Sequence, residues 1–218
     1  MDLIGGVGDL NTPDREVAVK VGVFNQKKIF PGHATVDVVD SIVHSFNMAL
    51  QVYLVESDNY KGTGLERLQV WKEIFTERVM PFSLSTDNET RQVEIAAEKI
   101  CLSRVLFKPN VFISTHVLRR IGRSIGTLNL ASVGSILKNL LGLMPERKKA
   151  GFHKKLTTVL LDAHEAIGGI DLAVLDGTYT YLGVGKTRKQ ERTNVLLVGR
   201  DAIAVEAVGA SLAGLNTH

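Results

Sequence analysis

The alternation of apolar and polar positions divides the first part of the chain into strands and helices in a regular order. Two runs rich in β-branched and apolar residues predict strands at Val17–Phe24 and Val52–Val55. Apolar residues recur at helical spacing over Val36–Leu50 and Gly62–Val79, and Thr35 is placed to cap the first of these helices. This strand–helix–strand–helix order is typical of parallel strands joined by crossover helices.

The middle of the chain has a weaker pattern. A loop is predicted over residues 81–90, followed by strands at Arg91–Ala96 and Asn110–Ser114. Residues 119–130 are basic and contain glycine, which favours an exposed loop. We therefore expect a small irregular insertion over residues 81–130.

The last third has the clearest pattern. Amphipathic helices are predicted over Val133–Met144 and Leu156–Ile167, and a final helix over Ala202–Leu215. Between them, Asp171–Leu175 and Asn194–Val198 read as buried strands. The pattern as a whole predicts one α/β domain over residues 1–218, with a mostly parallel open sheet and helices on both faces.

Composition narrows the class of protein. The 218 residues are 44% hydrophobic, but no apolar run is long enough to span a bilayer, and the start lacks the features of a signal peptide. We expect a cytoplasmic protein without a membrane partner. Cys101 is the only cysteine, which excludes an internal disulfide and a Cys-ligated iron–sulfur cluster within this chain. Its apolar surroundings predict a buried side chain.

The net charge of +3 is unevenly distributed. Basic residues gather at 119–123, 147–155 and 186–192, and such groups attract anions, although solvated basic loops have the same composition. Nucleic-acid binding is disfavoured, because the chain has no zinc-finger spacing, no aromatic RNA-binding signature and no long basic helix. The six histidines show no metal-ligand spacing, so neither a metal nor any other cofactor can be assigned from them.

Polar residues follow the predicted strands. In an open parallel sheet, ligands bind outside the carboxyl ends of the strands. The residues expected there are Asn25, Glu56, Asp58, Ser114, His116 and Asp176, and Asp201 opens the last helix. A carboxylate in such a place can bind a metal, accept a proton, or simply cap a helix or turn, and capping is the more common role.

The motifs of the last third resemble a known family. Lys138-Asn139, Gly142, Pro145 and His153 match the Lys-Asn-x-x-Gly-x-x-Pro…His segment of the domain of unknown function 362 family, which consists of uncharacterised prokaryotic α/β proteins. The segments 171–177 and 201–208 resemble its Asp-Leu-x-Val-x-Asp-Gly strand and the start of its Asp-Pro-x-Ala-x-Asp-Ala-Val helix. The resemblance is specific over residues 133–215 and thin before them.

The chain departs from the family pattern at three places. The Lys-x-His pair that precedes the Lys-Asn segment is absent, although His116 lies nearby. Glu206 stands where the family has aspartate, and Gly185-Lys186 stands where it often has Gly-Pro. Many relatives also carry a ferredoxin-like cluster segment, which this chain cannot provide.

Two functions follow as expectations. The first is an enzyme or binding protein that takes an anionic small molecule or a metal at the strand carboxyl ends. For it, the candidate catalytic residues are Asp176, His153 and Glu206, and the candidate ligand-binding residues are Lys138, Asn139, Asp201, Arg119 and Lys186. One pocket should then hold Asp176 and Lys138 together. The alternative is a non-catalytic accessory protein in a redox or cofactor-maturation pathway, with an exposed apolar or basic patch. A homo-oligomer is compatible with either.

Overall fold

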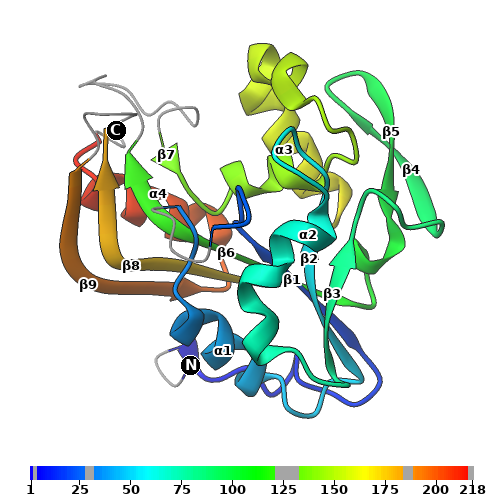
Figure 1. Cartoon of the computed structure of the whole chain (residues 1–218), viewed down its shortest axis with the longest axis horizontal. Helices are drawn as coiled ribbons and strands as arrows, with labels where there is room; N and C mark the ends of the chain where they lie inside the picture. The colour runs from blue at the N-terminus through cyan, green and yellow to red at the C-terminus, as the bar shows by residue number, and fades with distance from the viewer. Residues whose placement is uncertain (2–3, 28–31, 121–132, 184–188, 216–218) are drawn as a thin grey trace.

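The computed structural model of the chain describes residues 1, 4–27, 32–120, 133–183 and 189–215 (Figure 1). Its centre is a sheet whose strands follow the order β3-β2-β1-β6-β8-β9, with the short strand β7 attached to β6. In chain order these strands are Glu16–Val21 (β1), Gln51–Glu56 (β2), Val79–Ser83 (β3), Val111–Arg120 (β6), Val133–Gly134 (β7), Leu172–Leu182 (β8) and Lys189–Gly199 (β9).

Neighbouring strands from β3 to β8 run parallel, whereas β9 is antiparallel to β8, and β7 is antiparallel to β6. Parallel neighbours need crossover connections. Helix α1 (Val36–Ser45) connects β1 to β2, and α2 (Gly64–Leu68) with the 3-10 helix η2 (Gln69–Ile74) connects β2 to β3. The predicted fold class, a mostly parallel open sheet with helices on both faces, is confirmed.

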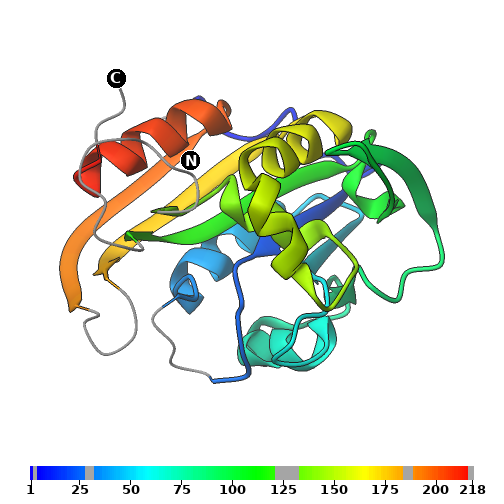
Figure 2. The same ribbon diagram turned by 90° about the horizontal axis from the view of Figure 1, so that it is seen from above.

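The two faces of the sheet bury separate apolar layers. In β1, Val17, Val19 and Val21 pack with α1 and η2, whereas Ala18 belongs to the layer on the opposite face. That opposite face carries α3 (Leu156–Ala166) and α4 (Ala202–Leu212), and Figure 2 shows both helices on the side away from α1. The connecting 3-10 helices η4 (Lys138–Leu143) and η5 (Lys149–Lys155) precede α3.

The expected irregular insertion contains an antiparallel hairpin. Strands β4 (Thr90–Ile95) and β5 (Glu98–Ser103) pair with each other outside the main sheet, and the 3-10 helix η3 (Arg104–Leu106) follows. Ile100 and Leu102 are buried, so Cys101 between them faces the other side of the strand and is exposed. The prediction that Cys101 is buried was therefore wrong, because strand alternation overrides the apolar character of the stretch.

Two predicted helices differ from the structure. The helical segment expected to continue to Val79 ends at Ile74, and Val79 begins β3. Strand β3 contains Pro81, which is tolerated because β3 is the edge strand of the described sheet. The helix expected over residues 133–144 is the short strand β7 followed by η4. Leu137, just before η4, and Leu140 and Leu143 within it are buried and spaced by three, which suits a 3-10 helix.

The helices of the last third follow the prediction closely. Helix α3 begins at Leu156 as expected, and the side chain of Asp201 accepts hydrogen bonds from Ile203 N and Ala204 N at 2.9 Å, so it caps α4. Strands β6 and β8 are longer than predicted and continue through His116 and Asp176. Among the described residues, no helix is long and apolar enough to cross a membrane.

Candidate functional site at the carboxyl edge of the sheet

A buried charge network lies at the carboxyl ends of β1 and β2. Lys20 Nζ lies 2.9 Å from Glu56 Oε1, and Arg67 Nη1 lies 3.5 Å from Glu56 Oε2. The three residues are 1%, 4% and 1% exposed in the order Lys20, Glu56, Arg67. Burial lowers the pKa of Lys20, and the carboxylate of Glu56 opposes that shift. Arg67 also donates hydrogen bonds to the carbonyl oxygens of Val23 and Ser57, and these bonds hold the backbone segments that follow β1 and β2.

This network holds η4 against the sheet. Asn139 Nδ2 donates to Lys20 O at 2.9 Å and to Thr115 O at 3.1 Å, while Asn139 Oδ1 accepts from Lys20 Nζ at 3.1 Å. Gly142 lies directly over the ion pair, because a Cβ there would be 2.6 Å from Lys20 Cε. Asn139, predicted to bind a ligand, is thus 6% exposed and occupied by protein groups, which makes it a positioning residue for η4.

Two histidines approach the same edge in the neutral form. The ring of His116 lies over Gly22, where an added Cβ would be 2.3 Å from His116 Cδ2, and its Nδ1 is 3.0 Å from Val117 O. A carbonyl only accepts, so Nδ1 carries the proton. His33 Nε2 accepts from Phe24 N at 3.1 Å. Burial, followed by the charge of Arg119, lowers the pKa of His33 to about 4 and that of His116 well below its usual value.

Two further cations at this edge are Arg119 and Lys138. Burial, followed by the neighbouring Arg119 guanidinium, lowers the pKa of Lys138 to about 8, and Glu206 opposes the shift. The same guanidinium acts on His33 and His116, so Arg119 lies within electrostatic reach of all three groups. Strand β6 and η4 therefore bring two cations predicted from the sequence, Arg119 and Lys138, to one place.

Glu206 reaches this place from α4. Its Oε2 accepts from Leu137 N at 3.1 Å, one residue before η4 begins, and the residue is 3% exposed. Burial raises its pKa, and the Ser135 hydroxyl with nearby backbone N–H groups partly opposes that rise. Glu206 thus fastens the start of η4 and sets the position of Lys138. Because burial raises the pKa of its carboxyl group, Glu206 is a candidate proton carrier at this edge.

Asp176 lies on the other face of the sheet. In β8, Leu172 and Val174 belong to the α1 layer, and Asp176 continues this alternation. Its Oδ2 accepts from Thr35 N at 2.7 Å and its Oδ1 from Thr178 N at 2.9 Å. The leucines of η4 pack on the opposite layer, so Asp176 and the apolar side of η4 lie on different faces of the sheet. Asp176 instead anchors the residue that precedes α1, two residues after His33.

The remaining predicted site residues are scattered. His153 is exposed on η5, and its pKa is lowered by partial burial and by Lys138, which places it near that lysine. Asp201 lies beyond the end of β9, where Gly199 pairs with Ala173 at the start of β8, so it is at the amino edge of the parallel strands. Lys186 lies outside the described residues.

Sequence reasoning did not select Lys20, Arg67 or His33. A signal existed for Lys20, since a lysine inside the apolar strand Val17–Val21 must be compensated by a partner when buried. No comparable signal existed for Arg67, which lies on an amphipathic helix where a surface position is the usual expectation. His33 lies outside the helices and strands, and no sequence pattern indicates that it reaches this edge.

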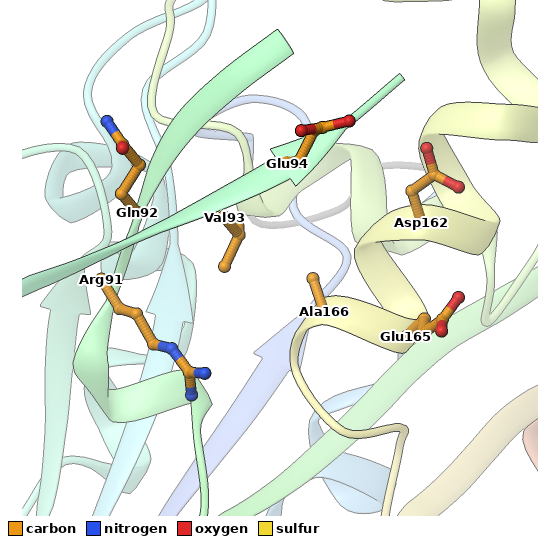
Figure 3. A pocket seen from close by; sticks show the side chains of 7 residues that line it. All are labelled: Arg91, Gln92, Val93, Glu94, Asp162, Glu165 and Ala166. Atoms are coloured by element: carbon orange, nitrogen blue, oxygen red, sulfur yellow. The ribbon is translucent and has the colours of Figure 1, made fainter. Parts of the chain in front are cut away.

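Other hollows lie away from this edge. Figure 3 shows one between β4 and α3, where Glu94, Asp162 and Glu165 surround an open space with Arg91 beside it. The hydrogen bond from Ala96 N to Asp162 Oδ2, at 2.7 Å, fastens the hairpin to α3 there. Among the described residues, no three His, Cys, Asp or Glu side chains lie close enough to hold a metal ion.

The family model of a domain of unknown function (DUF362) matches residues 17–211, and the chain belongs to this family. A search of curated proteins found no match. Among solved structures, the chain is similar to the lactate racemase apoprotein from Thermoanaerobacterium thermosaccharolyticum, with a TM-score of 0.48 and 10% sequence identity. That match covers 95% of this chain, which spans 50% of the length of the matched chain.

Proposed function

We propose that the carboxyl edge formed by β6 and η4 binds a small anion bearing a phosphate or carboxylate group. Arg119 and Lys138 would provide the charged contacts. The observation that carries the proposal is their convergence: two cations from separate elements lie within electrostatic reach of each other, and Arg119 also lies within reach of the buried His33 and His116. Like charges held together in this way are stabilised by an anion between them.

The surrounding residues suit this role. The network of Lys20, Glu56 and Asn139 is closed on itself by hydrogen bonds and keeps η4 at a fixed height over the sheet. Glu206 holds Leu137 N and therefore the backbone next to Lys138. We further propose His153, which is exposed on η5 and whose pKa is lowered by partial burial and by Lys138, as a proton carrier for a bound ligand. Asp176 and Asp201 have no part in this proposal, because they lie on the other face and at the other edge.

Titration calorimetry tests the proposal, with inorganic phosphate and citrate as probes. Lys138→Gln and Arg119→Gln should each weaken binding about tenfold or more, as expected when a charge-assisted contact is lost. Lys154→Gln is the matched control, because Lys154 is exposed on the neighbouring η5 and should leave the affinity unchanged.

Circular dichroism of each variant without a probe separates loss of binding from loss of folding. The proposal fails if the folded wild-type protein binds neither probe. It also fails if Lys138→Gln binds them as well as Lys154→Gln does, since binding would then come from the general basic character of the surface.

The alternative of a non-catalytic accessory protein requires an exposed surface for a partner. The described residues include an exposed apolar surface on β9 and α4, with Leu196 and Val208 about half exposed. The exposed end of β9 lies at the amino edge of the sheet, so this surface and the anion site can function independently.

A further inference from the structure

The carboxyl group of Glu206 has one buried oxygen without a hydrogen-bond partner. Its Oε2 accepts from Leu137 N at 3.1 Å, whereas its Oε1 has no partner among the described residues. The residue is 3% exposed. Burial raises the pKa of this carboxyl group, and the charge of Lys138 opposes the rise. A buried acceptor left in this state is costly, so a molecule that supplies the missing hydrogen bond is stabilised there.

The backbone of Lys138 is fixed beside this carboxyl group. Ser114 Oγ donates to Ile136 O at 3.1 Å from β6, and Ser135 Oγ accepts from Lys138 N at 3.5 Å. Glu206 binds the N–H of the residue just before Lys138. The segment that leads into Lys138 is buried, whereas Lys138 itself is only half-buried. Its side chain therefore starts from a rigid support and is accessible to a ligand.

Arg119 reaches the same place from β6. The antiparallel pairing of β6 with β7 puts Arg119 opposite Gly134, four residues before Lys138. Burial, followed by the Arg119 guanidinium, lowers the pKa of Lys138 to about 8. About one-tenth of such amines are unprotonated at pH 7, and an unprotonated lysine amine is a nucleophile. Arg119 stays charged at every physiological pH and can hold an anionic group.

We propose that Lys138 forms an imine with the ligand of this site, which is then an aldehyde or ketone that carries a carboxylate or phosphate group. The inference rests on the proposed anion site and adds the chemical class of its ligand. Arg119 binds the anionic group, the Lys138 amine attacks the carbonyl carbon, and Glu206 is the acid. A lysine that only provides charge needs neither a neighbouring guanidinium nor a carboxyl group with an unoccupied oxygen.

The reaction needs no reactant besides the ligand. The unprotonated amine of Lys138 forms the C–N bond, and the electron pair of the carbonyl bond moves to its oxygen, which takes a proton from the nitrogen. The carboxyl group of Glu206 then gives its proton to this hydroxyl, the C–O bond breaks, and water leaves as the nitrogen lone pair closes the C=N bond. The product is an iminium cation beside the Glu206 carboxylate, which accepts its N–H.

Reductive trapping on the wild-type protein tests the proposal at pH 7. Glyoxylate, a small carboxylate with an aldehyde, is the probe, and cyanoborohydride converts its imines into stable secondary amines that peptide mass spectrometry assigns to each lysine. Lys138 should be labelled about tenfold or more faster than Lys154, which is exposed on the neighbouring η5. Glycolaldehyde, which has the aldehyde but no anionic group, should show no such preference. Inorganic phosphate should slow the labelling of Lys138 alone.

A variant tests the acid. Glu206→Gln keeps an acceptor oxygen for Leu137 N but has no carboxyl proton to give, so the labelling of Lys138 should slow about tenfold or more. Glu165→Gln, at an exposed position on α3, is the control and should not change it. Circular dichroism shows whether each variant is folded. The peptide map of the wild-type protein decides the main claim without any variant.

Failure of this inference differs from failure of the anion site. If calorimetry shows phosphate binding but glyoxylate labels Lys138 no faster than Lys154, the imine is excluded and the anion site stands. If both aldehydes label Lys138 preferentially and phosphate does not slow the reaction, the anionic ligand class is excluded. Unchanged labelling in a folded Glu206→Gln variant would exclude Glu206 as the acid.

Discussion

Glu56→Gln tests the buried charge network on which the position of η4 depends. In the native protein, Glu56 Oε1 accepts from Ser57 N at 3.1 Å and faces Lys20 Nζ at 2.9 Å, while Oε2 accepts from Val23 N at 3.3 Å. Glutamine has the same shape but only one acceptor oxygen. Whichever way the amide is turned, its NH₂ group meets another donor, and the charges of Lys20 and Arg67 lose their counter-ion.

Breaking a buried ion pair by removal of one partner costs about 3–5 kcal/mol. For a chain of this length each kcal/mol lowers the melting temperature by roughly 2–4 °C, so we expect a fall of roughly 6–20 °C. The single tryptophan, Trp71, is 1% exposed and reports unfolding by fluorescence in urea. Glu77→Gln, at an exposed position, should change the free energy of unfolding by no more than about 0.5 kcal/mol.

A second substitution identifies the cause of the loss. If uncompensated charge is responsible, Lys20→Met in the Glu56→Gln background should recover part of the stability, because it removes one of the two excess cations. A loss below about 1 kcal/mol for Glu56→Gln would refute the reasoning that the pair is buried and essential. A large loss that Lys20→Met does not reduce would assign the effect to the backbone contacts at Val23 and Ser57.

Three further predictions concern the same edge and its opposite. Gly142→Ala should lower the free energy of unfolding by about 1–3 kcal/mol, because its Cβ would lie 2.6 Å from Lys20 Cε. Gly151→Ala is the control and should leave the free energy of unfolding unchanged, because a Cβ there has nothing within 4 Å. Equal urea midpoints for the two variants would contradict this prediction. Asp201→Ala should cost about 0.5–2 kcal/mol by removal of the α4 cap and leave phosphate affinity unchanged; calorimetry showing weaker phosphate binding would return Asp201 to the site. Since the pKa of Lys138 is lowered to about 8, its charge is present below that pH and lost above it. Phosphate binding should therefore weaken as pH rises through 8, and Lys138→Arg should abolish this dependence; a profile identical in both proteins would exclude Lys138 as its source.

The strand ends show how far local patterns reach toward the candidate site. Placing polar residues after apolar strands identified Glu56 and His116, and both lie at the carboxyl edge. The same rule selected Asp176, whose side chain faces the α1 layer. The difference arises because the rule predicts the edge of the sheet, whereas the face depends on the alternation of side chains along the strand. Strand β8 continues to Leu182, so Asp176 is an interior position of the strand.

The family motif illustrates the same limit. Lys138 and Asn139 are adjacent in the sequence, yet Lys138 lies among the cations and Asn139 is consumed by hydrogen bonds to β1 and β6. The spacing of Leu137, Leu140 and Leu143 was compatible with an α-helix in the sequence. In the folded chain this segment packs on the sheet as a 3-10 helix, and this geometry sets the directions of the Lys138 and Asn139 side chains.

The sequence by itself determined the α/β class, the helices α1, α3 and α4 and the cap at Asp201, because these depend on residues close together in the chain. Only the tertiary structure decided the charge network, since Lys20 and Asn139 are 119 positions apart and neither is compensated without the other elements. A buried lysine is tolerable only beside its carboxylate and amide partners, and long-range packing supplies those partners. The site is therefore a product of the fold, while the fold class is already present in the local pattern.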